Sequence, residues 1–335
     1  MATEVIASFS QLTRDGDSAN GRRSSANGRR PSAVAIGFFD GVHVGHQALV
    51  CATIDAARAR GLRSVVLTFA NHPATVVRPQ AAPKLITSRE QRVALLRRLS
   101  PDVLCVVPFD NALSQWEPRR FCEEVLRDAA ATRRLTVGRN FVLGRGRSGT
   151  VPVLESLGAE LGFEVVPFEP VEREGLAVSS SEIRAQIAAG RVERAAAFLG
   201  RPFSVTGIQI GGNRLGRELG FPTLNLHVAD ELLLPATGIY AARARLAGET
   251  FDAAVYLGAR ATFGGGAASF EVHLLGFSGE ADPGPVTIEL LSRVRDDARF
   301  ASAAELARQI GADVAEVRRR LREYRAPGDR EECRS

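Results

Sequence analysis

Two histidines and three glycines fall within ten residues, Gly37–His46, which read GFFDGVHVGH. An apolar run precedes this stretch and a helical pattern follows it, so we expect it to join a strand to the N-terminus of a helix. Free backbone N–H groups at a helix N-terminus bind phosphates, and glycine lets the backbone approach closely. We therefore expect a nucleotide-phosphate site in which His43 and His46 stabilise charge at phosphorus. The expected nucleotide-binding residues here are Gly37, Phe38, Asp40, Gly41 and Gly45.

Two surface histidines in a glycine-rich turn are the alternative for this stretch. The phosphate interpretation is favoured because two of the five histidines of the chain share one turn between a strand and a helix. The stretch is not a Walker A loop, because the pattern G-x-x-x-x-G-K-[ST] is absent.

The elements that must position this turn alternate between strands and helices. The expected strands are 33–39, 64–69, 103–109, 134–138 and 163–171, and the expected helices are 46–61, 88–99, 117–131 and 151–162. Strands separated by helices of this length indicate parallel βαβ units in a doubly wound α/β sheet. Such sheets bind ligands at the carboxyl ends of their strands, which is where the Gly37–His46 turn falls.

After Gly200 the pattern changes to short strands of period two. The expected strands are 203–210, 222–228, 238–246, 251–258, 270–277 and 286–294, preceded by two short helices within 180–200 and followed by a helix over 302–324. Regular short strands without intervening helices predict a small antiparallel β-barrel with a C-terminal helix.

The predicted domains follow from this change of pattern. They are a disordered N-terminal segment over 1–32, an α/β domain over 33–187, a barrel domain over 188–325 and a polar tail over 326–335. The 14–32 stretch repeats SANGRR and has few hydrophobic residues, so it cannot bury enough apolar surface to offset its chain entropy.

Composition and charge favour a cytoplasmic enzyme that binds small molecules. The net charge of +5 suits anionic ligands, and with only three tyrosines and one tryptophan we find no aromatic–basic pattern for nucleic acid. We see no signal sequence and no apolar run near the ~20 residues of a membrane span, so we expect no membrane partner. The four cysteines lack CxxC spacing, so we expect no zinc site or disulfide framework, with Cys51, Cys105 and Cys122 in the core and Cys333 as an exposed thiol.

The Gly37–His46 stretch resembles the GxFDGxHxGH signature of the nucleotidyltransferase superfamily, in the form seen in prokaryotic bifunctional riboflavin kinase/FAD synthetases. Three further stretches resemble motifs of that family, namely TFANHP (68–73), TVGRNFVLGRGRSGT (136–150) and VSSSEIR (178–184). The resemblance implies that Arg184 is a catalytic residue that holds ATP phosphates. The implied flavin-binding residues are His72, Pro73, Asn140 and Phe141, and the implied nucleotide-binding hydroxyls are those of Ser179, Ser180 and Ser181. A plain N-cap is the alternative for the serine run, because serine followed by glutamate is a capping pattern.

The second domain resembles the riboflavin kinase part of the same family. The run GIQIGGNRLGRELGFPTLNL (207–226) implies Mg²⁺ and phosphate binding at Thr223 and Asn225, with Gly212 and Gly216 in a nucleotide-binding glycine loop. The run SFEVHLLGF (269–277) implies that Glu271 is the catalytic base, which accepts the proton of the ribityl 5′-hydroxyl as this oxygen attacks ATP. Arg295 is implied to lie near the flavin. The alternatives are that Glu271 is a strand residue paired with an arginine and that PTLN is an ordinary beginning of a strand.

The resemblance implies two reactions, the phosphorylation of riboflavin to FMN by ATP and the adenylylation of FMN to FAD with release of pyrophosphate. The chain departs from the family pattern at Gly276, Gly211 and Ala261, where aspartate, histidine and proline are usual. The alternatives are therefore an FMN adenylyltransferase with a degraded or altered kinase domain, and a non-catalytic flavin-binding protein. A related nucleotidyltransferase for another acceptor is disfavoured, because the barrel with GFPTLN suits flavin chemistry.

Overall fold

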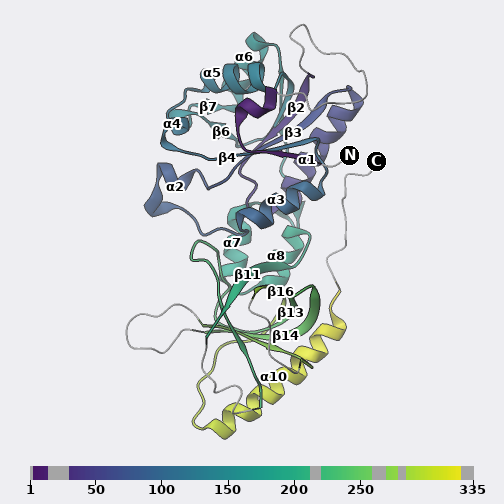
Figure 1. The fold of residues 1–335 in the computed structure, drawn as a ribbon, viewed down its shortest axis with the longest axis vertical. Coiled ribbons are helices and arrows are strands. Elements are labelled where there is room, and N and C mark those ends of the chain that lie inside the picture. The colour runs from purple at the N-terminus through teal and green to yellow at the C-terminus, as the bar shows by residue number, and fades with distance from the viewer. Residues whose placement is uncertain (1–2, 14–29, 212–219, 259–268, 278–283, 326–335) are drawn as a thin grey trace. The chain divides into compact units, whose positions relative to one another are not determined.

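The computed structural model describes residues 3–13, 30–211, 220–258, 269–277 and 284–325 (Figure 1). The described residues form two compact units. Those of the first unit fall in Met1–Pro83 and Arg89–Val178, and those of the second fall in Lys84–Ser88 and Ser179–Arg330. The predicted boundary at 187/188 therefore lies too late in the chain, because helix α7 (Ser180–Ala188) packs against α8 (Val192–Leu199) in the second unit.

The first unit contains a six-stranded parallel sheet with the strand order β1-β4-β3-β2-β5-β8. Its strands are β1 (Glu4–Ile6), β2 (Ser32–Ile36), β3 (Arg63–Phe69), β4 (Val103–Val107), β5 (Thr132–Gly138) and β8 (Glu164–Phe168). Every residue of β2, β3 and β4 is buried, as expected for parallel strands that are covered on both faces. The predicted doubly wound parallel sheet is confirmed.

Helices cover both faces of this sheet. Val34 and Ile36 point into a core shared with the π-helix η4 (Cys122–Ala129) and α6 (Val151–Leu161). Ala35, between them, points into a second core shared with α1 (Val44–Ala59) and α3 (Arg89–Arg98). The remaining elements of this unit are η1 (Phe9–Thr13), η2 (Asp40–Val42), α2 (Ala74–Val77), η3 (Pro79–Ala81), α4 (Asn111–Ser114), α5 (Pro118–Phe121), β6 (Val142–Leu143), η5 (Arg145–Arg147), β7 (Gly149–Thr150), β9 (Glu172–Arg173) and β10 (Leu176–Ala177).

The prediction of disorder over 1–32 is wrong for Glu4–Thr13. Strand β1 pairs in parallel with β4 at the edge of the sheet, and the side chains of Ile6 and Leu12 join the core. A three-residue strand with one buried side chain is too short to produce a readable pattern. Residues 14–29 and the predicted polar tail 326–335 lie outside the described residues.

The cysteines differ in part from the expectation. Cys105 and Cys122 are free and buried, and burial raises the pKa of each thiol to about 12. Cys51, which is only half-buried in α1, is disulfide-bonded, so the expectation of a free core cysteine is wrong for it. Chain spacing carries no information on this point, because a disulfide depends on the distance between residues in the fold. Cys333 lies outside the described residues.

The second unit is a closed antiparallel barrel with the strand order β11-β12-β15-β14-β13-β16, which confirms the prediction. Its strands are β11 (Phe203–Ile210), β12 (Leu224–His227), β13 (Gly238–Leu246), β14 (Glu249–Gly258), β15 (Ser269–Leu274) and β16 (Pro285–Arg295). Helix α10 (Ala303–Glu323) lies along the outside of β13, β14 and β16 (Figure 1).

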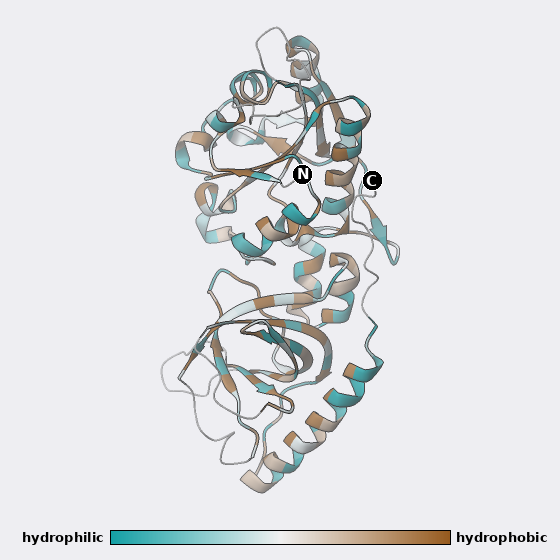
Figure 2. Ribbon diagram, turned by 45° about the vertical axis from the view of Figure 1, so that its right-hand side comes forward, coloured by the Kyte–Doolittle hydropathy of each residue, from teal (hydrophilic) through white to brown (hydrophobic). Residues whose placement is uncertain are grey.

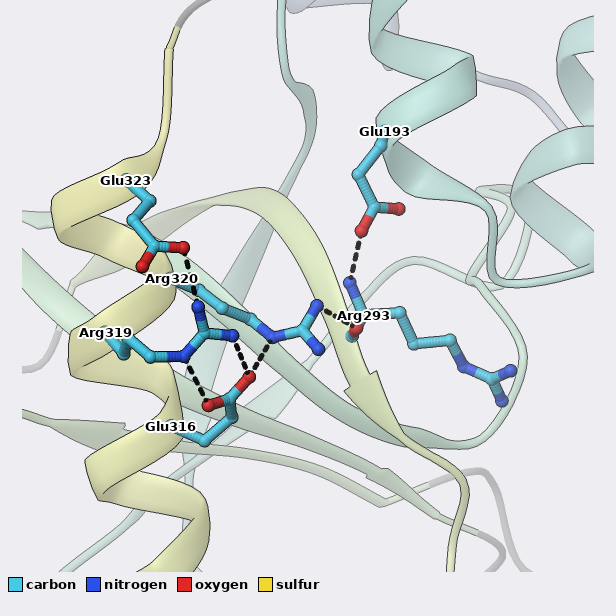
Figure 3. A network of polar contacts seen from close by, with 6 residues as sticks. All are labelled: Glu193, Arg293, Glu316, Arg319, Arg320 and Glu323. Carbon is cyan, nitrogen blue, oxygen red and sulfur yellow. Dashed lines mark hydrogen bonds and ion pairs between the residues drawn. The ribbon is translucent and has the colours of Figure 1, made fainter.

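Helix α10 is held to the barrel by an apolar side and a polar network. Hydrophobic and hydrophilic residues alternate along it (Figure 2), and Val317 and Leu321 pack on the barrel. In Figure 3, Glu316 accepts hydrogen bonds from two arginines of the same helix, and one of them, Arg320, also donates to the backbone oxygen of Arg293 on β16. None of the helices in the described residues is both long and apolar enough to span a membrane.

Candidate active sites

The loops that follow β2, β3 and β5 leave the same edge of the sheet, because these three strands are parallel neighbours. The chain winds from β2 to one side through β3 and β4, and the later strands β5 and β8 lie on the other side. The gap between β2 and β5 is therefore the point where the winding direction changes, and such points are where doubly wound sheets bind ligands. This topology places the predicted phosphate and flavin residues of the first unit at one edge.

The loop after β2 has an unusual backbone that burial holds in place. Phe39, Gly41 and Val42 have positive φ angles of 56°, 79° and 41°. This conformation is strained for a β-branched residue such as Val42. Phe39 and Val42 are buried in the core that includes α1, and Asp40 is buried as well. The predicted strand 33–39 therefore ends at Ile36, because the chain must turn where the side chain of Phe39 enters the core.

The two histidines lie face to face at the start of α1. Their ring centroids are 3.5 Å apart and the ring planes differ by 19°. His43 is the N-cap residue, and its Nδ1 accepts a hydrogen bond from the backbone N–H of His46 over 3.3 Å. An accepting Nδ1 leaves Nε2 as the N–H donor of the neutral ring. A Cβ atom on Gly45 would lie 3.2 Å from the His43 ring, so glycine makes room for this arrangement.

Arg92 is a functional candidate that the sequence analysis missed. It is fully buried, its guanidinium stacks 4.0 Å from the ring centre of Phe38, and it donates to the backbone oxygens of Phe69 and Ala70 over 2.7 and 3.0 Å. Burial lowers its pKa to about 10. Its spacing could have revealed this burial, because Arg92 precedes the buried residue Leu96 by one helical turn and therefore lies on the face of α3 that enters the core. Arg92 thus joins the end of β3 to the loop after β2.

The predicted flavin residues of the first unit occupy two loops. The ring of His72 meets the ring of Phe38 edge to face at 4.6 Å, and its Nδ1 accepts a hydrogen bond from Ala74 N–H over 3.0 Å. Pro73, next to it, is the N-cap residue of α2. Beyond β5, Asn140 is exposed and Phe141 packs partly against the core.

The predicted serine run begins α7 in the second unit. Ser179 is the N-cap and its Oγ accepts a hydrogen bond from Glu182 N–H over 3.2 Å, so the capping interpretation is correct for this residue. Ser180 and Ser181 follow in the first turn. Nε of Arg184 donates to the backbone oxygen of Lys84 over 2.8 Å.

Glu271 lies on the outer face of the barrel among hydroxyl groups. Its Oε1 accepts a hydrogen bond from Ser269 Oγ over 2.9 Å, and its Oε2 accepts one from Thr223 Oγ over 3.4 Å. Asn225 is its register partner on β12 and Tyr256 is its partner on β14. In the part of the chain that the structure describes, no arginine forms an ion pair with Glu271.

The strand register extends this arrangement into a row. Tyr256 is paired with Ile239 on β13, and Ile239 is paired with Arg295 on β16. We call Asn225, Glu271, Tyr256, Ile239 and Arg295 the outer row, since paired residues of adjacent strands lie on one face of a sheet. The hydroxyl of Tyr256 also donates to Asp297 over 3.3 Å. The outer row therefore connects the predicted phosphate end, the predicted base and the predicted flavin residue.

The segment before β12 is fastened to β15. Gly220 has a φ angle of 85°, and the ring of Phe221 meets the ring of His273 edge to face at 5.7 Å. A ring nitrogen of His273, Nδ1, lies 2.8 Å from the backbone oxygen of Pro222. These contacts hold Thr223 beside Glu271.

The departures from the family pattern that the structure describes touch none of these side chains. Gly276 follows β15 with a φ angle of 78°, and a Cβ atom there or on Gly211 would meet nothing within 4 Å. The predicted loop residues Gly212 and Gly216, as well as Ala261, lie outside the described residues.

The donor set fits Mg²⁺ bound together with a nucleotide. Within the described residues, no cluster of three or more histidine, cysteine, aspartate or glutamate side chains could hold a metal ion. Mg²⁺ in phosphoryl-transfer sites takes oxygen from one or two protein groups and the rest from phosphates and water. Thr223, Asn225 and Glu271 are oxygen donors of this kind, with Thr223 and Glu271 in direct contact.

Comparisons with known proteins identify the family of the chain. The family model described as FAD synthetase matches residues 25–182, and the one described as riboflavin kinase matches residues 199–321. The bifunctional riboflavin kinase/FMN adenylyltransferase of Bacillus subtilis is 32% identical over 85% of this chain and 91% of the relative. That of Pseudomonas fluorescens is 34% identical over 84% of this chain and 91% of the relative.

A solved structure is similar along nearly the whole chain. It is a crystal structure described as a macrolide-efflux protein from Streptococcus pneumoniae, with a TM-score of 0.80 and 28% identity over 94% of this chain and 98% of that chain. The resemblance seen in the sequence motifs is confirmed by the family models and the relatives. The chain therefore belongs to the bifunctional riboflavin kinase/FMN adenylyltransferase family, with an FAD synthetase domain followed by a riboflavin kinase domain.

Proposed function

We propose that the barrel phosphorylates riboflavin to FMN and that the α/β unit transfers the adenylyl group of a second ATP to FMN, giving FAD and pyrophosphate. The observation that carries the proposal is the outer row, with Glu271 between the oxygen donors of β12 and the aromatic and cationic side chains beyond it. Family membership supports both activities in one chain.

In the barrel, Glu271 accepts the proton of the ribityl 5′-hydroxyl while this oxygen attacks the γ-phosphorus of ATP. The hydroxyls of Ser269 and Thr223 orient the carboxylate, since each donates to one of its oxygens. Thr223 and Asn225 would hold Mg²⁺ and the nearby phosphates. When bound, the ion neutralises charge on the phosphates.

The outer row also defines the orientation in which riboflavin binds. Three strand spacings of about 4.8 Å separate Glu271 from Arg295, a path of about 14 Å along the curved outer face of the barrel on which an elongated substrate can lie. The ribityl hydroxyl lies at Glu271, and the isoalloxazine ring extends over Tyr256 and Ile239 toward Arg295. The guanidinium there is a donor for the ring carbonyls.

In the α/β unit, the FMN phosphate attacks the α-phosphorus of ATP and pyrophosphate leaves. A phosphate monoester has its second pKa near about 6, so the attacking group is already a dianion and needs no strong base. His43 and His46 supply N–H donors to the phosphorus oxygens as charge builds up on them. Backbone N–H groups of the loop from Gly37 to Gly45 hold the phosphates, and His72, Pro73, Asn140 and Phe141 bind the flavin. Arg184 and the hydroxyls of Ser179, Ser180 and Ser181 are proposed as further phosphate ligands from the motif resemblance alone.

A product assay tests this proposal. The purified full-length protein is incubated with ATP and Mg²⁺, once with riboflavin and once with FMN, and the flavins are separated by chromatography. Both FMN and FAD from riboflavin support the two activities. FAD from FMN alone would remove the kinase from the proposal, and binding of flavin without any turnover would overturn it entirely.

A further inference from the structure

Arg295, at the end of the outer row, is bound by a carboxylate from the C-terminal helix. Its Nε and Nη2 donate to Oδ1 and Oδ2 of Asp313 over 2.8 and 2.7 Å, a two-pronged ion pair. Nη1 donates to the backbone oxygen of Asp296 over 2.8 Å. All three guanidinium nitrogens therefore have fixed acceptors, which sets the plane of the group.

The two partners of this ion pair differ in exposure. The side chain of Asp313 is 7% exposed, whereas that of Arg295 is 24% exposed. Asp313 Oδ1 also accepts a hydrogen bond from Gln309 Nε2 over 2.9 Å, one turn earlier on α10. The carboxylate is thus fixed behind the arginine, and the arginine keeps an accessible surface at the end of the outer row.

Tyr256 connects this ion pair with the base. It is the register partner of Glu271, and its hydroxyl donates to Asp297, two residues beyond Arg295. Tyr256 is therefore next to Glu271 in the strand register and hydrogen-bonds a residue that is close to Arg295 in the chain.

We propose that Asp313 is a positioning residue of the kinase site, through which helix α10 sets the orientation of Arg295 toward the ring end of riboflavin. This inference rests on the proposed kinase function. Asp313 touches no substrate, and it acts by holding the guanidinium in one plane. Loss of its charge weakens riboflavin binding and leaves the phosphoryl-transfer chemistry at Glu271 and Thr223 in place.

The test measures kinase kinetics in the full-length protein with the substitution Asp313→Asn. The KM for riboflavin should rise about tenfold, because a charge-assisted two-pronged contact is replaced by a neutral one. The KM for ATP, the kcat of the kinase and the adenylylation of FMN should each stay within about twofold. An unchanged KM for riboflavin, or an equal loss in all of these quantities, would overturn the proposal.

Glu316→Gln is the matched control on the same helix. Glu316 also accepts hydrogen bonds from two arginines, Arg319 and Arg320, but none of the three belongs to the outer row. This variant should leave the KM for riboflavin unchanged. A rise equal to that of Asp313→Asn would show that any loosening of α10 suffices and would overturn the specific role of Asp313.

A double substitution tests whether Asp313 acts through Arg295. Arg295→Ala should raise the KM for riboflavin, and adding Asp313→Asn to it should produce no further rise, since no guanidinium remains to be positioned. Additive effects would contradict the proposal. Its failure is distinguishable from failure of the proposed function, because in the latter case the unsubstituted protein makes no FMN from riboflavin.

Discussion

The two sites of this chain are built in opposite ways. In the α/β unit, the loop after β2 is shaped by its own burial, with Phe39 and Val42 held in the core at positive φ angles. In the barrel, Glu271 and Tyr256 stand half-buried on the outer face of the strands. The hydroxyls of Ser269 and Thr223 orient Glu271, and a hydrogen bond to Asp297 orients Tyr256. A site that binds phosphate with backbone N–H groups needs a fixed backbone, whereas a site that moves one proton needs one accessible side chain. The site in the α/β unit should therefore be sensitive to changes in packing, and the site in the barrel to the loss of single functional groups.

The largest expected effect is in the barrel. Glu271→Gln keeps the shape of the side chain and removes the base, so riboflavin phosphorylation should fall about 10²- to 10⁴-fold. The adenylylation of FMN by the same protein should stay unchanged. Glu289→Gln on β16 is the control, because Glu289 lies outside the outer row, and it should retain kinase activity. Equal kinase rates for the two variants would remove Glu271 from the mechanism.

The corresponding substitution in the α/β unit is His46→Ala. Loss of a donor that meets charge at phosphorus should lower the rate of FMN adenylylation about 10²- to 10³-fold, with riboflavin phosphorylation unaffected. His227→Ala on β12 is the control, since this histidine is exposed, and it should behave like the unsubstituted protein. Full adenylylation activity of His46→Ala would remove the side chain of His46 from the mechanism.

A glycine substitution beside His43 tests sensitivity to packing without the loss of a functional group, and its effect on adenylylation should be smaller. Gly45→Ala removes no functional group, but the new Cβ would lie 3.2 Å from the His43 ring and must displace it. Adenylylation should fall several-fold, while thermal stability holds or rises because alanine favours a helix by about 1 kcal/mol over glycine. Gly311→Ala in α10, where a Cβ would meet nothing within 4 Å, should raise stability without changing either activity. Unchanged adenylylation in Gly45→Ala would show that the site tolerates a shift of His43.

The smallest expected effect is on stability, and it comes from an ion pair that lies away from both sites. Hydrogen bonding to Arg60, the residue that follows α1, and then to Arg134 on β5, lowers the pKa of Glu164 on β8. Because the folded protein holds this carboxyl ionised, its contribution is present above the unfolded pKa of 4.5 and is lost as the pH falls through the lowered value. Glu164→Gln should cost about 0.5 kcal/mol near neutral pH, as expected for exposed ion pairs. Urea unfolding should show this difference shrinking in acid, and a difference that grows in acid would contradict the assignment.

The sequence predicts the parts of the fold and of the sites that depend on local interactions. It does not predict the parts that depend on residues distant in the chain. The position of His43 and His46 at the carboxyl edge of the sheet follows from a local pattern, an apolar strand, glycines and then a helix. The barrel strands follow in the same way from their period of two. The positive φ of Val42 and the burial of Arg92 depend on residues distant in the chain, such as Phe38 and Phe69 around Arg92.

The pairing of Arg295 with Asp313 also depends on residues that are distant in the chain. It depends on how α10 lies on the barrel, and no spacing along the chain encodes that placement. Strand β1 escaped prediction for a different reason, because three residues at a sheet edge with one buried side chain leave no periodic signal.

The central claim is that one chain carries two separate active sites, and a complementation assay tests it most directly. Glu271→Gln and His46→Ala proteins are each given riboflavin, ATP and Mg²⁺, alone and as an equal mixture, and FAD is measured. We predict little FAD from either variant alone and near-normal FAD from the mixture, because FMN made by the His46→Ala protein can be adenylylated by the Glu271→Gln protein. A mixture as inactive as its components would contradict the account, since it would mean that the two reactions do not proceed at independent sites.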